Sequence, residues 1–322
     1  MRYSVSAAPN PKPATLETGG QIMKRYLLLC ALSLMLCWSS SGALAQGDLS
    51  KVEIKSAQVS GNVYMLEGAG GNIGVSVGSD GILIVDDQFA PLADKIRAAL
   101  KKLGEGKLKY ILNTHWHGDH TGGNKEFGPE APIIAHDNVR KRLSGELKPT
   151  TGTAQPAPPE ALPVITFDQS LSVFFNGEEI RVMHVPPGHT DGDSVIFFTR
   201  SNVVHMGDQF FNGMFPFVDL SSGGDVEGYA RNVEAVLAKV PAGAKIIPGH
   251  GPLASIDDLK KFHQTLVETI SIVRDRMKAG KTADQIKAEK PLEKWESWGK
   301  GFMKTDNWIQ IVYQSLSNNS RR

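Results

Sequence analysis

Four metal-ligand side chains crowd into T-H-W-H-G-D-H, residues 114–120, and this cluster constrains the chain more than any other feature. His115 and His117 alternate by two, so an extended backbone aims both imidazoles to the same side. The glycine that follows permits a tight turn, which brings Asp119 and His120 to a neighbouring position. Imidazole and carboxylate are good zinc ligands, and four exceed what one tetrahedral ion with an open catalytic position needs. The cluster therefore predicts two ions.

Each group of candidate ligands follows a predicted strand. The cluster comes directly after the buried run K-Y-I-L at 109–112. Three further groups do the same: His189 in P-P-G-H after 180–185, Asp208 in M-G-D after 203–206, and His250 in P-G-H-G after 245–248. Loops at one edge of a rigid sheet are where functional sites are built, so we expect these residues to share a site. The isolated histidines are expected to be core or surface residues instead: His136, His184, His205 and His263.

Short apolar runs separated by glycine turns predict strands, and two longer patterns with helical spacing follow them. The expected strands are 63–67, 73–77, 82–85, 109–112, 171–175, 180–185, 194–198, 203–206 and 245–248. The expected helices are 90–103, 226–240 and 257–279. A Pro-rich stretch at 151–163 is predicted to be a surface loop, because ligand motifs lie on both sides of it. The order of strands then helix, twice, predicts an α/β fold of two packed sheets with helices outside.

The N-terminal region predicts export. From Met23, M-K-R precedes an apolar run, and A-L-A-Q follows it, a pattern typical of a secretory signal cleaved after Ala45. The apolar run Tyr26–Trp38 has 13 residues. A span needs about 20, which disfavours the alternative of a transmembrane anchor. We therefore expect a periplasmic or secreted protein without a stable membrane anchor after cleavage.

The predicted signal peptide divides the chain into three parts. Residues 1–22 are expected to be a non-physiological or disordered extension, which makes Met23 the expected start, and residues 23–45 the signal peptide. Residues 46–322 would form a single domain with a helical tail from about 282. The two cysteines, Cys30 and Cys37, both lie in the signal, so the mature chain would have no disulfide and no thiolate ligand.

The net charge of the chain indicates what kind of partner to expect. The chain carries 35 basic and 34 acidic residues, a formal charge of +1, which gives no reason to expect a nucleic-acid partner. We expect a small-molecule substrate.

The motifs resemble those of the metallo-β-lactamase superfamily of αββα hydrolases, over roughly residues 52–266. T-H-W-H-G-D-H, P-G-H-T-D-G-D, M-G-D and P-G-H-G match its metal motifs in the family's order. The resemblance implies one ion held by His115, His117 and His189, and a second held by Asp119, His120 and His250, with Asp208 bridging the two. It also implies that Asp86, in I-V-D-D, supports the metal-binding loop, although an ordinary turn residue is the alternative.

The resemblance implies a reaction class as well. Two zinc ions would hold a shared hydroxide that attacks an ester, lactone, thioester or amide carbonyl, with Asp119 orienting this nucleophile. Iron or manganese can occupy a site of this ligand type. Two alternatives stay open: a metallo-β-lactamase, and a non-hydrolytic metalloprotein such as an iron-dependent oxygenase or a zinc-binding module.

An aromatic segment, F-F-N-G-M-F-P-F-V at 210–218, follows Asp208 directly. We expect it to form an apolar wall or lid beside the metals, and a core segment is the alternative. The expected lining residues are Phe210, Phe211, Met214, Phe215 and Phe217. Some β-lactamases of the family place a lysine three residues after their thiolate ligand to hold the substrate carboxylate. The corresponding position here is Phe211, which disfavours a dedicated β-lactamase.

Overall fold

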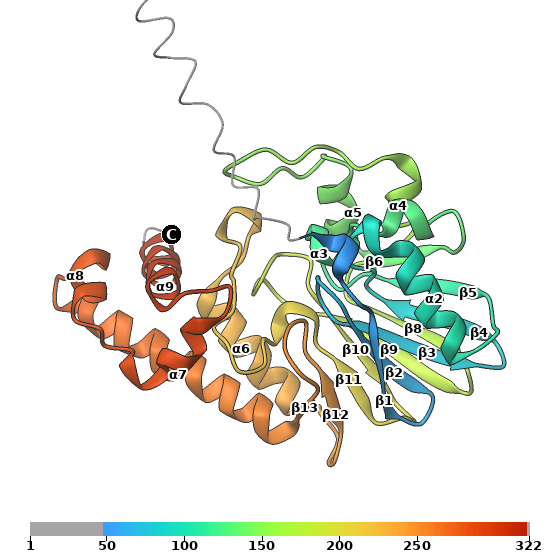
Figure 1. The fold of residues 1–322 in the computed structure, drawn as a ribbon. Coiled ribbons are helices and arrows are strands. Elements are labelled where there is room, and N and C mark those ends of the chain that lie inside the picture. The colour runs from blue at the N-terminus through green and yellow to red at the C-terminus, as the bar shows by residue number, and fades with distance from the viewer. Residues whose placement is uncertain (1–47, 321–322) are drawn as a thin grey trace, which may run out of the picture. The chain divides into compact units, whose positions relative to one another are not determined.

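Two β-sheets face each other in the computed structural model, which describes residues 48–320 (Figure 1). The first sheet has seven strands in sequence order: β1 (Lys55–Ser60), β2 (Val63–Glu67), β3 (Ile73–Gly78), β4 (Gly81–Val85), β5 (Leu108–Leu112), β6 (Ile133–His136) and β7 (Ile165–Phe167). Its first four strands form an antiparallel meander, and β4 to β7 are parallel. Parallel neighbours end at the same edge, which places the loops after β4 and β5 side by side.

The second sheet has six strands in the order β13-β12-β11-β10-β9-β8. Their bounds are β8 (Ser170–Phe175), β9 (Glu178–His184), β10 (Ser194–Phe198), β11 (Val203–His205), β12 (Lys245–Ile247) and β13 (Ala254–Ser255). Its pairs are antiparallel except β11 with β12, where His205 pairs with Ile247. The loops after β11 and β12 therefore leave the sheet at one edge, with Asp208 and His250 just beyond it.

Helices cover the outer face of each sheet (Figure 1). On the first sheet pack α2 (Ala93–Leu103) and α4 (Asn124–Phe127), while α3 (Gly118–Thr121) and α5 (Asp137–Leu143) follow the ends of β5 and β6. The second has α6 (Val226–Leu237), α7 (Ile256–Lys278), α8 (Ala283–Ala288) and α9 (Thr305–Asn319). The short 3-10 helices are η1 (Leu49–Lys51), η2 (Ala90–Leu92), η3 (Pro159–Ala161), η4 (Gly207–Gln209), η5 (Leu220–Ser222) and η6 (Glu293–Lys300).

Three apolar clusters hold these layers together. Residues such as Leu83, Val85 and Leu112 of the first sheet meet Val182 and Ile196 of the second between the sheets. A second cluster packs α2 on the outside of the first sheet, and a third packs α6, α7 and α9 on the outside of the second. Because each sheet buries both faces, its central strands are largely apolar, as in the fully buried β4 and β10. The predicted α/β sandwich with outer helices is confirmed.

The elements that the sequence pattern missed are short or polar. β1 is largely exposed on the edge of the first sheet, and β13 has two residues. The Pro-rich stretch at 151–163 is mostly exposed and contains only η3. From Leu49 the chain forms one compact unit, and α8, η6 and α9 complete its C-terminal part. The predicted signal and the extension before it lie outside the described residues, within which no helix is long and apolar enough to cross a membrane.

Candidate metal centre

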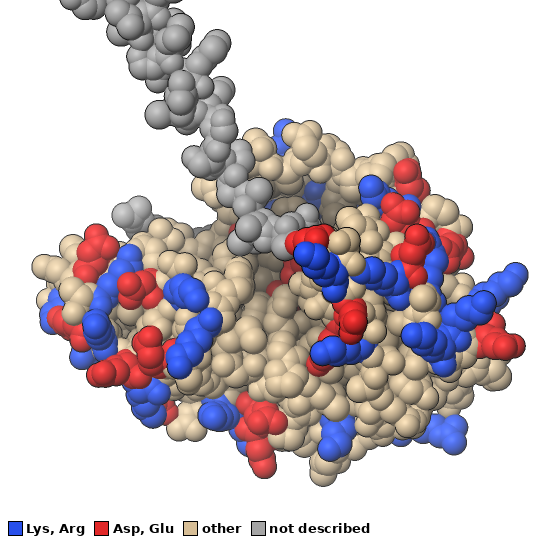
Figure 2. Space-filling model, viewed as in Figure 1, with Lys and Arg blue, Asp and Glu red and all other residues tan. Residues whose placement is uncertain are grey.

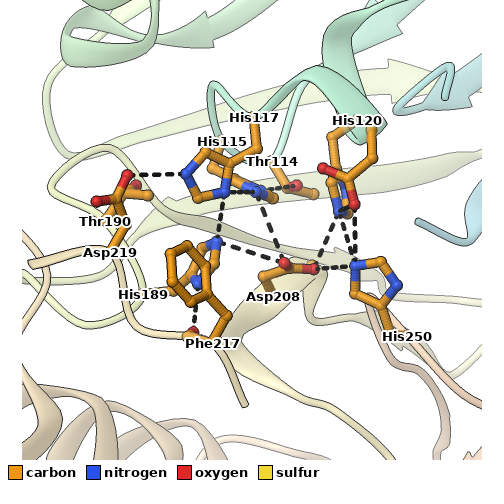
Figure 3. A network of polar contacts seen from close by, with 12 residues as sticks. Thr114, His115, His117, His120, His189, Thr190, Asp208, Phe217, Asp219 and His250 are labelled. Carbon is orange, nitrogen blue, oxygen red and sulfur yellow. Dashed lines mark hydrogen bonds and ion pairs between the residues drawn. The ribbon is translucent and has the colours of Figure 1, made fainter. Parts of the chain in front are cut away.

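Seven predicted ligands meet at the sheet edge in two groups (Figure 3). The first group is His115, His117, His189 and Asp208, and the second is Asp119, His120 and His250. Within each group the candidate ligand atoms lie within 4.8 Å of one another. Residues more than a hundred positions apart come together, because every contributing loop leaves a strand at the same edge of the sandwich.

Five segments position these side chains. The loop after β5 carries His115 and His117, and α3 follows at once with Asp119 and His120. His189 lies in the loop between β9 and β10. Asp208 lies in η4, directly after β11. His250 follows β12, and the parallel pairing of β11 with β12 brings it beside Asp208.

Asp208 lies between the two groups. Its Oδ2 is 3.3 Å from His189 Nε2 and 3.8 Å from His115 Nε2. Its Oδ1 is 3.0 Å from His120 Nε2 and 3.3 Å from His250 Nε2. Although these nitrogens lie at ion-pair distance, the buried Oδ1 accepts no well-directed hydrogen bond from the described residues. One oxygen thus faces each group, which is the arrangement that a bridging ligand requires.

The inward-facing histidine nitrogens lie close to one another. His117 Nδ1 is 3.1 Å from His115 Nε2 and 2.8 Å from His189 Nε2. His120 Nε2 and His250 Nε2 are 3.4 Å apart. Nitrogens that face each other this closely need a proton or a cation between them, so the donor set fits metal ions.

The outward nitrogens show which tautomers are present. His117 Nε2 lies 3.0 Å from Asp219 Oδ2, His120 Nδ1 lies 2.8 Å from Asp86 Oδ2, and His189 Nδ1 lies 2.7 Å from the carbonyl oxygen of Phe217. A carboxylate or carbonyl can only accept, so each of these outer nitrogens donates its proton. The inner nitrogens of neutral rings then keep their lone pairs for an ion.

Asp86 supports the loop that carries the ligands. Its Oδ1 accepts from the Thr114 backbone N–H at 2.8 Å, and its Oδ2 accepts from Thr114 Oγ1 at 2.8 Å. The Thr114 hydroxyl in turn lies 3.0 Å from His115 Nδ1 and accepts its proton. Asp86 has a φ of 65°, a left-handed conformation that is uncommon outside glycine. A strained, fully buried carboxylate therefore orients both His115 and His120.

The ionisable groups of the centre shift one another's pKa values. Burial raises the pKa of Asp208, but the surrounding histidines outweigh it and hold that pKa well below its usual value. Burial lowers the pKa of His189 to about 4, so this ring is neutral. Although burial opposes the shift, the carboxylates of Asp208 and Asp119 raise the pKa of His250 to about 9. Positive charge is thus favoured around Asp208, whether protons or metal ions supply it.

The expected aromatic wall is only partly present. Phe210 and Phe215 are fully buried in the core cluster of the second sheet, so a substrate does not reach them and their expected lining role is corrected. Phe211 is 1% exposed and stacks on the His250 ring with centroids 4.9 Å apart, so its expected lining role is corrected as well. Met214 and Phe217 keep partly exposed side chains. Burial varies along this loop because one side of it packs against the C-terminal helices.

Sequence reasoning missed Asp219. Its Oδ1 caps η5 by accepting from the backbone N–H groups of Ser221 and Ser222, while its Oδ2 faces His117. An aspartate before L-S-S is a recognisable cap signal. No local pattern indicates its second partner, because His117 lies 102 positions away.

Two glycines let the backbone approach the ligands. A Cβ on Gly249 would collide with Asp208 Oδ1, and a Cβ on Gly71 would collide with the His120 ring. Gly249 belongs to the P-G-H-G motif, and Gly71 to the loop between β2 and β3. Both positions therefore require glycine for a packing reason.

Comparison with known proteins gives a consistent relationship. A family model described as the metallo-beta-lactamase superfamily matches residues 57–253. A hydroxyacylglutathione hydrolase from Gloeobacter violaceus is 28% identical over 220 residues, which cover 64% of this chain and 77% of that protein. The metallo-beta-lactamase type 2 of Bacteroides fragilis is 23% identical over 68% of this chain and 89% of that protein.

The solved structures agree on the fold. The crystal structure of DIM-1 metallo-beta-lactamase superposes with a TM-score of 0.55 at 21% identity, covering 68% of this chain and 99% of that chain. The chain spans about half the length of other hydroxyacylglutathione hydrolases that it matches, 52% of one and 55% of another.

Proposed function

Because this chain belongs to the metallo-beta-lactamase superfamily, we propose that it is a binuclear zinc-dependent hydrolase acting on an ester, lactone, thioester or amide bond. The observation that carries the proposal is Asp208, whose two oxygens face the two ligand groups. A donor set of nitrogen and oxygen alone suits zinc, and iron or manganese are the other metals of matching chemistry. When bound, such ions would lower the pKa of a water to about 7 and polarise the bond to be cleaved.

The protein's own residues would orient the reactants. Asp119 keeps 30% of its side chain exposed, more than any other ligand. Although burial opposes it, His120 and His250 hold the Asp119 pKa below its usual value, so the carboxylate stays ionised. An ionised, accessible carboxylate at this position can accept a hydrogen bond from an attacking water and fix its direction.

A β-lactamase is the second candidate, supported by the similarity to the Bacteroides fragilis enzyme over 89% of its length. The position three residues after Asp208 argues against it. Phe211 stands there, 1% exposed and stacked on His250, and offers no cation to a substrate carboxylate. We therefore favour the broader esterase, lactonase or thioesterase activity, which the similarity to hydroxyacylglutathione hydrolases also supports.

We further propose that residues 23–45 direct export and that the mature protein acts on a small molecule in the periplasm or outside the cell. The apolar run after a basic start supports export. The near-neutral charge and the recessed ligand groups support a small-molecule substrate.

The test combines metal content with turnover. Elemental analysis of metal-replete protein is expected to give two zinc ions per chain, and a panel of esters, lactones, thioesters, a cephalosporin and a carbapenem is expected to show turnover of the first three classes. His189→Ala should abolish this turnover with its circular dichroism spectrum unchanged, since it removes a ligand and little core. One ion or none, or full activity in the variant, would refute the binuclear hydrolase.

A further inference from the structure

The C-terminal segment 293–304 is anchored to the loop that runs from Asp208 to Asp219. The Phe215 backbone N–H donates to the Trp298 carbonyl at 3.2 Å. The Phe215 ring lies 6.1 Å from Trp298 and stacks at 5.8 Å on Trp308 of α9. A Cβ placed on Gly301 would touch the Met214 side chain at 3.5 Å. The segment is therefore held beside the metal centre rather than apart from it.

Phe302 is exposed although other large side chains of the segment are buried. Trp298 is 7% exposed and Met303 is 4% exposed, but Phe302 is 54% exposed. The Phe302 ring lies 6.2 Å from Phe217 in an edge-on contact. An aromatic side chain in this position adds little to stability, because most of its apolar surface stays in water.

Phe217 connects Phe302 to the metal centre. Its ring lies 5.9 Å from His117 and 6.0 Å from His189, and its carbonyl oxygen accepts the His189 Nδ1–H bond. An apolar surface thus runs outward from the first ligand group to Phe302. Figure 2 shows a hollow between the lobe of α7, α8 and α9 and the side that carries α2, with many of the charged side chains on either side of it.

We propose that Phe217 and Phe302 form an apolar wall that binds a hydrocarbon group of the substrate. The C-terminal segment would then give this enzyme a preference for substrates with a chain of several carbons. The family model ends at residue 253, so the residue that sets this preference lies outside the part of the chain that the model matches. The inference rests on the proposed hydrolase function and deepens it by naming the class of substrate.

The kinetic test uses two ester series, one with acyl chains from acetyl to octanoyl and one with alcohols from ethyl to octyl. For the wild type, kcat/KM is expected to rise with chain length in one series, mainly through KM. Phe302→Ala should reduce the octyl-to-ethyl or octanoyl-to-acetyl ratio roughly 10-fold, as expected for loss of one large apolar contact, and Phe302→Leu should keep most of it. The matched control is Phe174→Ala, which removes a phenylalanine that is 78% exposed on β8 and should leave the ratio unchanged.

A binding measurement separates this inference from the proposed function. Titration calorimetry of the metal-loaded protein should show tighter binding of octanoate than of acetate, and Phe302→Ala should remove that difference while Phe174→Ala keeps it. A wild type that prefers octanoate through Phe302 but turns over no ester, lactone or thioester of the panel would overturn the hydrolase proposal and leave the apolar wall standing. Equal binding of the two carboxylates, or a chain-length preference that survives in Phe302→Ala, would overturn the wall.

Discussion

Asp208 is the side chain that contacts both candidate ligand groups, with one carboxylate oxygen facing each. We expect Asp208→Ala to lose one of two zinc ions. Its turnover should fall by more than the roughly 10–100-fold that is typical when a hydrogen-bond partner of a metal ligand is removed. Metal titration and turnover measured on the same preparation test this. Asp257→Ala, whose side chain is 89% exposed on α7, is the matched control. Two tightly held ions with full turnover in Asp208→Ala would remove this residue from the site.

Asp219 acts through His117, so its effect is expected in metal affinity. Asp219→Asn keeps an acceptor for the cap of η5 but places an N–H opposite His117 Nε2. The ring then has to turn its lone pair outward, which leaves Nδ1 protonated and unfit to bind an ion. We expect zinc to bind the first group about 10–100-fold more weakly, measured by competition with a chelator. Asp284→Asn, 92% exposed on α8, should bind as the wild type does.

At the scale of secondary-structure elements, two stacked histidines connect the two sheets. His136 at the end of β6 and His184 at the end of β9 stack with centroids 3.8 Å apart and an interplanar angle of 13°. Burial lowers the pKa of both rings, and for His136 the neighbouring His184 lowers it further. The surrounding Asp137, Asp168 and Asp191 oppose these shifts, directly or through a backbone carbonyl.

This pair should make stability depend on pH. A histidine whose folded pKa is depressed contributes its full stability above the unfolded pKa of about 6.5, and the contribution falls as pH drops towards the folded pKa, where the unfolded chain binds more protons. We expect His184→Gln to show a shallower decline in the free energy of unfolding between pH 7.5 and 5 than the wild type, measured by urea denaturation. His263→Gln, on α7, should retain the wild-type slope, and an equally steep decline in His184→Gln would contradict the prediction.

At the scale of the whole molecule, the proposed signal peptide lies outside the compact unit. The compact unit begins at Leu49, so removal of residues 1–45 would leave it intact. We expect mass spectrometry of protein from the periplasm or medium to find an N-terminus at Gln46. A product that retains Cys30 and Cys37 would instead indicate an uncleaved anchor.

The convergence of the seven candidate ligands and the layered fold were predictable because local chemistry encodes both. A metal site needs particular residue types in loops that follow strands, and the spacing of His115, His117 and Asp119 states this within five residues. Buried strands such as β4 and β10 are continuous apolar runs, which makes them visible without any contact information. The exposed β1 lacks that pattern, because its side chains are not buried. It is a strand only through its backbone pairing with β2.

Only the tertiary structure decided which atoms face which. The pairing of His117 with Asp219, and the choice of Nδ1 rather than Nε2 as its inward nitrogen, depend on loops from different strands meeting at one edge. The aromatic loop after Asp208 gives the same lesson. Phe215 is buried and Phe217 is half-open because the C-terminal helices pack on one side of that loop. Phenylalanines of identical chemistry thus become buried or partly exposed according to contacts with distant segments, which no local pattern of residues can specify.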